Sequence, residues 1–189
     1  TQRLTLAGGV TWSFARREVG GTVAAASNYI VLSPRVCLTW RPRREWELFA
    51  RYERGSEPPT VDDLLAVAGT PNDLAVRWTP LRRQRADTFE LGVRHPAMST
   101  HSVFEVTAYA ANRRNELLRQ VDGDGAAVGA INAGPTRHVG LETALAFQLV
   151  KGWCKWNDVE VRLAHNWGVS RFAGDPIYGH NRLAGRPAH

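Results

Sequence analysis

The sequence predicts an all-β protein made of antiparallel strands, and three observations support this prediction. Apolar and polar residues alternate with a period of two over several runs, as they do in a strand with two different faces. No run shows a helical period longer than two turns. The connections between the runs alternate in length between short and long, which suits strands that return beside one another.

The clearest alternation runs over residues 31–40, where nearly every second side chain is apolar. Residues 41–45, which contain a proline and three arginines, interrupt the pattern, and it resumes over residues 46–53. Two alternating runs joined by a short break predict a β-hairpin with a tight, basic turn. Pro58 and Pro59 then predict the end of the second strand, because proline cannot donate a hydrogen bond to a sheet.

The same period of two recurs in the rest of the chain, so that we expect about seven to eight strands in total. The further predicted strands cover residues 4–14, 84–95, 103–118, 137–149 and 159–167.

The predicted connections fall into a short class and a long class. Short turns are expected over residues 41–45, 95–100 and 150–156, and long loops over residues 15–28, 55–83, 115–135 and 172–186. Within the second long loop, Thr60 can cap a short helix over residues 60–67. Residues 122–125 predict the tip of a hairpin loop. Short turns at one rim and long loops at the other are typical of outer-membrane barrels, in which the short turns are periplasmic.

The alternation itself leaves two interpretations open, because a soluble β-sandwich and a membrane β-barrel both have one apolar face. Charged residues within the polar faces, strands long enough for a tilted crossing, and aromatic residues near strand ends favour the barrel. The candidate membrane-interface aromatics are Trp12, Trp40, Trp46, Phe147, Trp153 and Trp156.

The composition of the chain limits which partners and which class of protein it fits. The 189 residues have a formal net charge of +6, which a nucleic-acid partner would explain, but the arginines are spread over turns, loops and strands. We therefore predict no nucleic-acid partner. No stretch approaches the roughly 20 apolar residues of a membrane helix. The chain begins with Thr1 and without a signal peptide, so we expect an internal part of a longer protein.

No group of residues predicts catalysis or metal binding. The six histidines are scattered, without metal-ligand spacing, and the serines lack the setting of a nucleophile. Cys37 and Cys154 predict two small, partly buried side chains rather than a redox pair. Residues 122–125 begin like a calcium loop, but no glutamate closes it. We expect no enzyme activity and no cofactor.

Six stretches follow one another along the chain: Leu32–Val36, Trp46–Ala50, Glu57–Leu64, Leu81–Gly92, Asn132–Glu142 and Asp175–His189. Taken in this order, they resemble the barrel of TonB-dependent outer-membrane receptors. Ser56 and Asp63 stand where that family usually has an aromatic residue and a glutamate.

The resemblance implies that residues 1–189 form part of a transmembrane barrel of about 22 strands, without the plug domain and the remaining strands. It implies a location in the outer membrane of a Gram-negative bacterium, in contact with lipid. It also implies an active importer of a scarce ligand, usually a ferric siderophore, which the TonB complex energises through a missing N-terminal part. The alternative from another class is a soluble β-sheet module that binds a polyanion or a glycan.

Ligand contacts, if this chain makes any, are expected in the long loops. Positive charge near the outer rim would attract an anionic ferric complex. The candidates are Arg82, Arg83, Arg113 and Arg114, none of which comes from a family motif.

Overall fold

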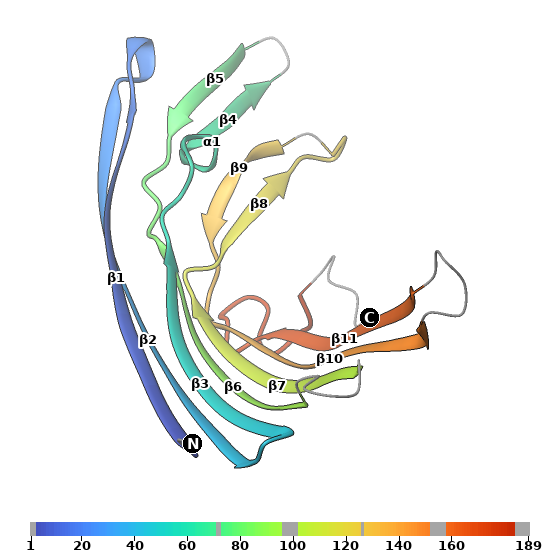
Figure 1. Ribbon diagram of the computed structural model, residues 1–189. Coiled ribbons are helices and arrows are strands. Elements are labelled where there is room, and N and C mark those ends of the chain that lie inside the picture. The colour runs from blue at the N-terminus through green and yellow to red at the C-terminus, as the bar shows by residue number, and fades with distance from the viewer. Residues whose placement is uncertain (1–2, 71–72, 96–101, 126, 152–157, 184–189) are drawn as a thin grey trace.

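The computed structural model describes residues 3–70, 73–95, 102–125, 127–151 and 158–183. Within them, one antiparallel sheet of seven strands forms a curved wall with a concave and a convex face (Figure 1). The sheet is open, with β1 and β11 at its edges. The predicted all-β, antiparallel fold is therefore confirmed. Among the described residues no helix has the length and apolar character that a membrane crossing requires.

The wall is built from long strands that pair in chain order, apart from two excursions between neighbours. Its strands are β1 (Leu4–Val19), β2 (Ala25–Arg43), β3 (Trp46–Glu57), β6 (Gln84–His95), β7 (Ser102–Arg114), β10 (Thr136–Lys151) and β11 (Asp158–Phe172).

The excursions carry the smaller elements. The first holds α1 (Val61–Leu64), β4 (Leu65–Thr70) and β5 (Asp73–Trp78), and the second holds β8 (Leu117–Val121) and β9 (Ala127–Asn132). A 3-10 turn, η1 (Gly21–Val23), joins β1 to β2. All of these lie at one end of the wall, which we call the loop rim; the opposite end, with the β2–β3 connection, is the turn rim (Figure 1).

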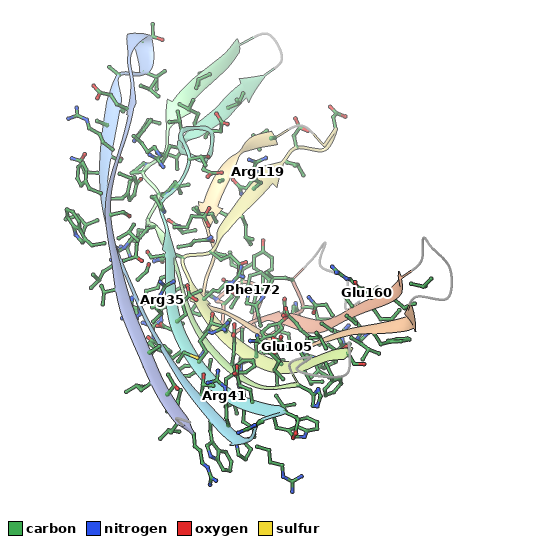
Figure 2. The ribbon with its side chains drawn as sticks, viewed as in Figure 1. Arg35, Arg41, Glu105, Arg119, Glu160 and Phe172 are labelled. Carbon is green, nitrogen blue, oxygen red and sulfur yellow. The ribbon has the colours of Figure 1, made fainter. Side chains whose placement is uncertain are left out.

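The register of the sheet brings the apolar side chains of all seven strands onto one face, because alternate residues of paired strands share a side. The polar residues that alternate with them point to the other face; of these, Arg35 and Glu105 lie on the concave side (Figure 2). One row across the apolar face consists of Leu6, Leu38, Ala50, Leu91, Ala108, Leu141 and Trp167.

This apolar face points away from the concave side and is open. The side chains of Leu6 and Leu91 are 71% and 66% exposed, and those of Leu48 and Leu141 are 39% and 37% exposed. In a sandwich these positions would be covered by a second sheet. The wall is instead that of a barrel, with apolar residues outside and polar residues inside.

On the inner face, aromatic rings cover glycines on neighbouring strands. The ring of Phe49 on β3 occupies the space that a Cβ at Gly92 on β6 would need, and Tyr109 does the same for Gly140 on β10. An aromatic ring that lies over a glycine replaces the packing that the missing side chain would provide. These contacts hold strands together where the inner face lacks a side chain.

Several predicted boundaries are wrong, mostly because strands continue where loops were expected. The exception is the predicted strand over residues 103–118, because β7 already ends at Arg114. β1 and β2 extend through most of residues 15–28 and leave only residues 20–24 as a connection. The predicted loops over 55–83 and 115–135 each contain a hairpin, β4–β5 and β8–β9. Backbone pairing needs no alternation of side chains once a strand leaves the apolar region, so periodicity does not reveal these segments.

Other local predictions are confirmed at least in part. The predicted helix over residues 60–67 exists but ends at Leu64, and residues 65–67 belong to β4. Thr60 caps α1, with its hydroxyl 3.2 Å from the amide nitrogen of Asp63, and the Asp63 carboxylate accepts a hydrogen bond from the Thr60 amide at 2.9 Å. Such a reciprocal capping box stabilises a helix start. Residues 122–125 form the tip between β8 and β9. The predicted turns over 95–100 and 150–156 lie largely outside the described residues, as does Cys154.

Candidate functional site

The loop rim contains the buried apolar clusters of the described chain, and these fix the connections in place. Leu64 of α1, Leu81 and Ala130 of β9 form one cluster, against which Trp78 and Leu117 pack. Leu64 is completely buried. A second cluster joins residues before β10 to the segment that follows β11; it consists of Ala133, Phe172 and Leu183, with Leu118 against it.

A buried polar network lies beneath these clusters, where β10 and β11 reach the loop rim. Glu116 follows β7, and its carboxylate accepts a hydrogen bond from the Thr136 hydroxyl at 2.5 Å and lies 3.3 Å from His138 Nε2. The other ring nitrogen of His138, Nδ1, lies 2.7 Å from the Ser170 hydroxyl on β11. Arg113 forms an ion pair with Glu116 at 3.1 Å. The network joins three strands to one connection.

The surroundings of Glu116 determine its ionisation. Burial raises the pKa of the Glu116 carboxyl, but hydrogen bonds from His138 and Thr136, together with the charges of His138 and Arg113, more than offset this effect. The net result lowers the pKa from 4.5 to about 2. Glu116 is therefore a fixed negative charge in the rim at neutral pH, and its chemistry is that of a structural anchor.

The inner face below the rim has charges that pair between adjacent strands, as expected for a polar barrel interior. Arg51 on β3 lies 2.8 Å from Glu90 on β6. Arg94 on β6 lies 2.7 Å from Glu105 on β7 and 3.6 Å from Glu47 on β3. These pairs follow the strand register and spread both signs of charge over the inner wall.

The structure separates the four rim arginines that the sequence suggested as ligand contacts. The Arg82 side chain is exposed, and its backbone amide donates to the Asn132 side chain at 2.7 Å. Arg83 donates from its guanidinium to the backbone carbonyl of Ile30 on β2. Arg113 belongs to the Glu116 network, and Arg114 follows it on the opposite face of β7. A ligand role for these residues stays a prediction.

The predicted interface aromatics are placed as follows. Trp12, Trp40 and Trp46 lie on the outer face, with 67%, 49% and 37% of their surface exposed. Trp46 also makes an edge-to-face contact with His95, with ring centroids 5.0 Å apart. Phe147 pairs with Val161 across β10 and β11. Trp153 and Trp156 lie outside the described residues.

The sequence did not point to the Glu116 network. Its members are separated by up to 57 positions, from Arg113 to Ser170, and follow no spacing rule. They meet only because the register of β7, β10 and β11 brings them to one end of the sheet. Asn115, immediately before Glu116, has a φ of 55°, a left-handed conformation that asparagine tolerates, and the chain turns sharply there.

Comparisons with known proteins agree with this architecture. The family model "TonB dependent receptor-like, beta-barrel" matches residues 1–189. Among solved structures, the ferric yersiniabactin uptake receptor FyuA from Yersinia pestis has a TM-score of 0.71 at 17% identity over 100% of this chain and 28% of its own. The copper transporter OprC has a TM-score of 0.66 at 17% identity, over 88% of this chain and 26% of its own.

A third similar structure is the FrpB iron transporter from Neisseria meningitidis, with a TM-score of 0.60 at 15% identity over 95% of this chain and 27% of its own. The chain thus spans roughly a quarter of the length of these proteins. No curated protein matches the chain. The family consists of transporters and receptors of the Gram-negative outer membrane rather than of enzymes. This chain belongs to the β-barrel family of TonB-dependent outer-membrane receptors.

Proposed function

We propose that this chain is part of the barrel of an outer-membrane transporter that imports a ferric siderophore or another iron complex and is energised by TonB. The observation that carries the proposal is the curved wall with an apolar outer face and a charged inner face, in a chain that belongs to this family throughout its length. Two of the similar structures are named for iron uptake, which favours iron over the copper of OprC.

In this proposal the chain contributes wall and loops, whereas the plug domain, the TonB-contacting segment and the remaining strands belong to the longer protein. The paired inner charges, such as Arg51 with Glu90, keep the wall rigid and polar where the plug lies against it. The loop rim faces the outside medium, because long connections lie on that side in outer-membrane barrels.

Among the suggested ligand contacts, the geometry favours Arg82. Its guanidinium is exposed at the loop rim, while its backbone is fixed by two hydrogen bonds to Asn132, at 2.7 and 2.8 Å. A charged side chain on a fixed backbone attracts an anionic complex without a large ordering cost. Arg113 is committed to Glu116, so its charge is already neutralised.

Uptake by the full-length receptor tests the proposal. The gene is expressed in a Gram-negative host that lacks its own siderophore receptors, and accumulation of radioactive iron is followed for catecholate, hydroxamate and phenolate siderophores and for haem. We expect accumulation of at least one iron complex that disappears when tonB is deleted. Uptake of copper or cobalamin without any iron complex would refute the iron assignment, and uptake that does not need TonB would refute the mechanism.

A further inference from the structure

Five arginines of β3, β6, β7, β10 and β11 lie on the outer face of the wall, above the apolar residues of these strands and close to the loop rim. Arg54, Arg137 and Arg171 lie in one row across the sheet, because Arg54 pairs with Asp87, Asp87 with Asn112, Asn112 with Arg137, and Arg137 with Arg171. The next outer row toward the loop rim adds Arg85 and Arg114, which pair with each other. We call these five residues the outer arginine belt.

The belt shares its face with the lipid-facing residues. Toward the turn rim, the outer face of the same strands has Tyr52, Phe89, Ala110, Val139 and Val169. These residues are two positions from Arg54, Arg137 and Arg171 and four positions from Arg85 and Arg114, and residues an even number of positions apart in a strand share a side. Phe89 is 54% exposed. The Tyr52 hydroxyl donates a 2.8 Å hydrogen bond to Asp87, and its ring packs against Phe89 with centroids 4.9 Å apart. The aromatic pair marks the level at which the apolar surface ends.

Only part of the belt is neutralised. Asp87 lies 2.6 Å from Arg54 and 3.1 Å from Arg85 and is shared between them. Arg114, Arg137 and Arg171 have no carboxylate partner within the described part of the chain, and all three are exposed. Five arginines against one aspartate leave a formal charge of +4 on this surface. Arginines beside the hydrocarbon region need an anionic partner at the same depth.

We propose that the outer arginine belt binds the phosphate groups of a phosphorylated lipid in the outer leaflet. Arg137 and Arg171 are direct partners on adjacent strands, so their side chains can reach one phosphate together, and the guanidinium group matches phosphate geometry with paired hydrogen bonds. Arg137 and Arg171 also line a hollow of about 630 Å³, together with Val139 and Val169, which are the next outer residues toward the turn rim. The first carbons of an acyl chain fit against these two valines.

A phosphorylated lipid fits this surface better than other anions. A soluble anionic ligand that enters the barrel meets the inner face, whereas the belt lies on the outside of the wall. A divalent cation that bridges lipid phosphates would be repelled by the arginines, so the arginines replace it. From the loop rim toward the turn rim, the outer face has arginines, then an aromatic pair, then an apolar surface. This order matches the charged headgroup, the interfacial region and the acyl chains of a lipid.

The test compares full-length receptors by native mass spectrometry after lipid exchange in detergent, with bisphosphorylated lipid A as the probe. The variant Arg114→Gln/Arg137→Gln/Arg171→Gln removes the three unneutralised charges. We expect its affinity for lipid A to fall by about tenfold or more, because charge-assisted hydrogen bonds are lost. The control Arg43→Gln/Arg44→Gln/Arg119→Gln removes three exposed arginines away from the belt and should keep its affinity within about twofold.

Two further measurements show whether the arginine charges and the lipid phosphates carry the binding. Arg114→Lys/Arg137→Lys/Arg171→Lys keeps the charge, so we expect partial retention of binding, and this variant decides the matter if the glutamine variant does not assemble. Dephosphorylated lipid A should bind the wild type and the glutamine variant equally. Equal lipid A binding by all variants, or displacement of lipid A by inorganic phosphate at similar concentration, would overturn the proposal, the latter in favour of a simple anion site.

Discussion

Glu116 shows how a single residue can fix the loop rim. Its pKa in the folded protein is about 2, against an ordinary value of 4.5, so the folded state favours the carboxylate. A lowered pKa adds stability that is fully present above pH 4.5 and is lost as the pH falls toward 2, where the carboxyl group takes up its proton in both states. The shift corresponds to no more than about 3.5 kcal/mol.

We therefore expect Glu116→Gln to lower the free energy of unfolding of the full-length receptor by about 2–3 kcal/mol above pH 4.5. The difference from wild type should shrink between pH 4.5 and pH 2. Urea unfolding in detergent at several pH values measures it. Glu18→Gln serves as the control, because Glu18 forms an exposed ion pair with Arg16 and contributes little. A difference for Glu116→Gln that does not depend on pH would contradict this account.

Gly92 offers a second prediction for one residue. A Cβ at this position would collide with the ring of Phe49, whereas one at Gly55 would meet no atom within 4 Å. We expect Gly92→Ala to destabilise the full-length receptor by about 1–3 kcal/mol, because the ring must leave its site. Gly55→Ala should have little effect. The change is measured as a fall in the temperature at which the receptor loses its heat-modifiable mobility on gels.

The source of the Gly92 effect can be checked with a second substitution. In the background Phe49→Ala the ring is absent, so Gly92→Ala should cost little more. Independent, additive costs of the two substitutions would show that the contact between Phe49 and Gly92 is not the cause.

At the scale of elements, α1 and the two hairpins β4–β5 and β8–β9 depend on one another through the cluster around Leu64. Leu64→Ala should cost about 2–5 kcal/mol, because it leaves a cavity at a fully buried site. The loss should remain local: limited proteolysis is expected to cut faster within residues 65–78 and 117–132, while the barrel keeps its heat-modifiable mobility. The matched control is Val76→Ala on β5, which is 47% exposed. Slower cutting, or cutting of the wall strands, would contradict the local effect.

The elements also show what periodicity predicts and what it does not. The wall strands have different surroundings on their two faces, so their side chains alternate, and the sequence predicted each of them. The hairpins β4–β5 and β8–β9 were predicted mostly as loops, apart from residues 65–67, which were assigned to a short helix, and residues 117–118, which were assigned to the end of a strand. The Glu116 network was missed because Thr136, His138 and Ser170 are brought to it by strand register, which the sequence alone does not specify.

At the scale of the whole molecule, the outer and inner faces of the wall have opposite character and the sheet has two edges. β1 and β11 each have one neighbour among the described strands. Lipid cannot hydrogen-bond to an unpaired strand edge, so the sheet needs further strands to close. We expect residues 1–189, expressed alone, to show no heat-modifiable band after refolding with lipid vesicles, whereas the full-length receptor shows one. A folded, inserted form of residues 1–189 would contradict the need for closure.

The central claim is that the apolar face of the wall contacts lipid, and adjacent residues on β10 test it most directly. Leu141 belongs to the outer face and Glu142 to the inner face. In the full-length receptor, with all native cysteines, including Cys37 and Cys154, replaced by serine, a single cysteine at either position carries a bimane label, and the receptor is reconstituted into vesicles with brominated lipid. The account predicts strong quenching at Leu141→Cys and weak quenching at Glu142→Cys. Equal quenching at the two positions, or the reverse order, would contradict it.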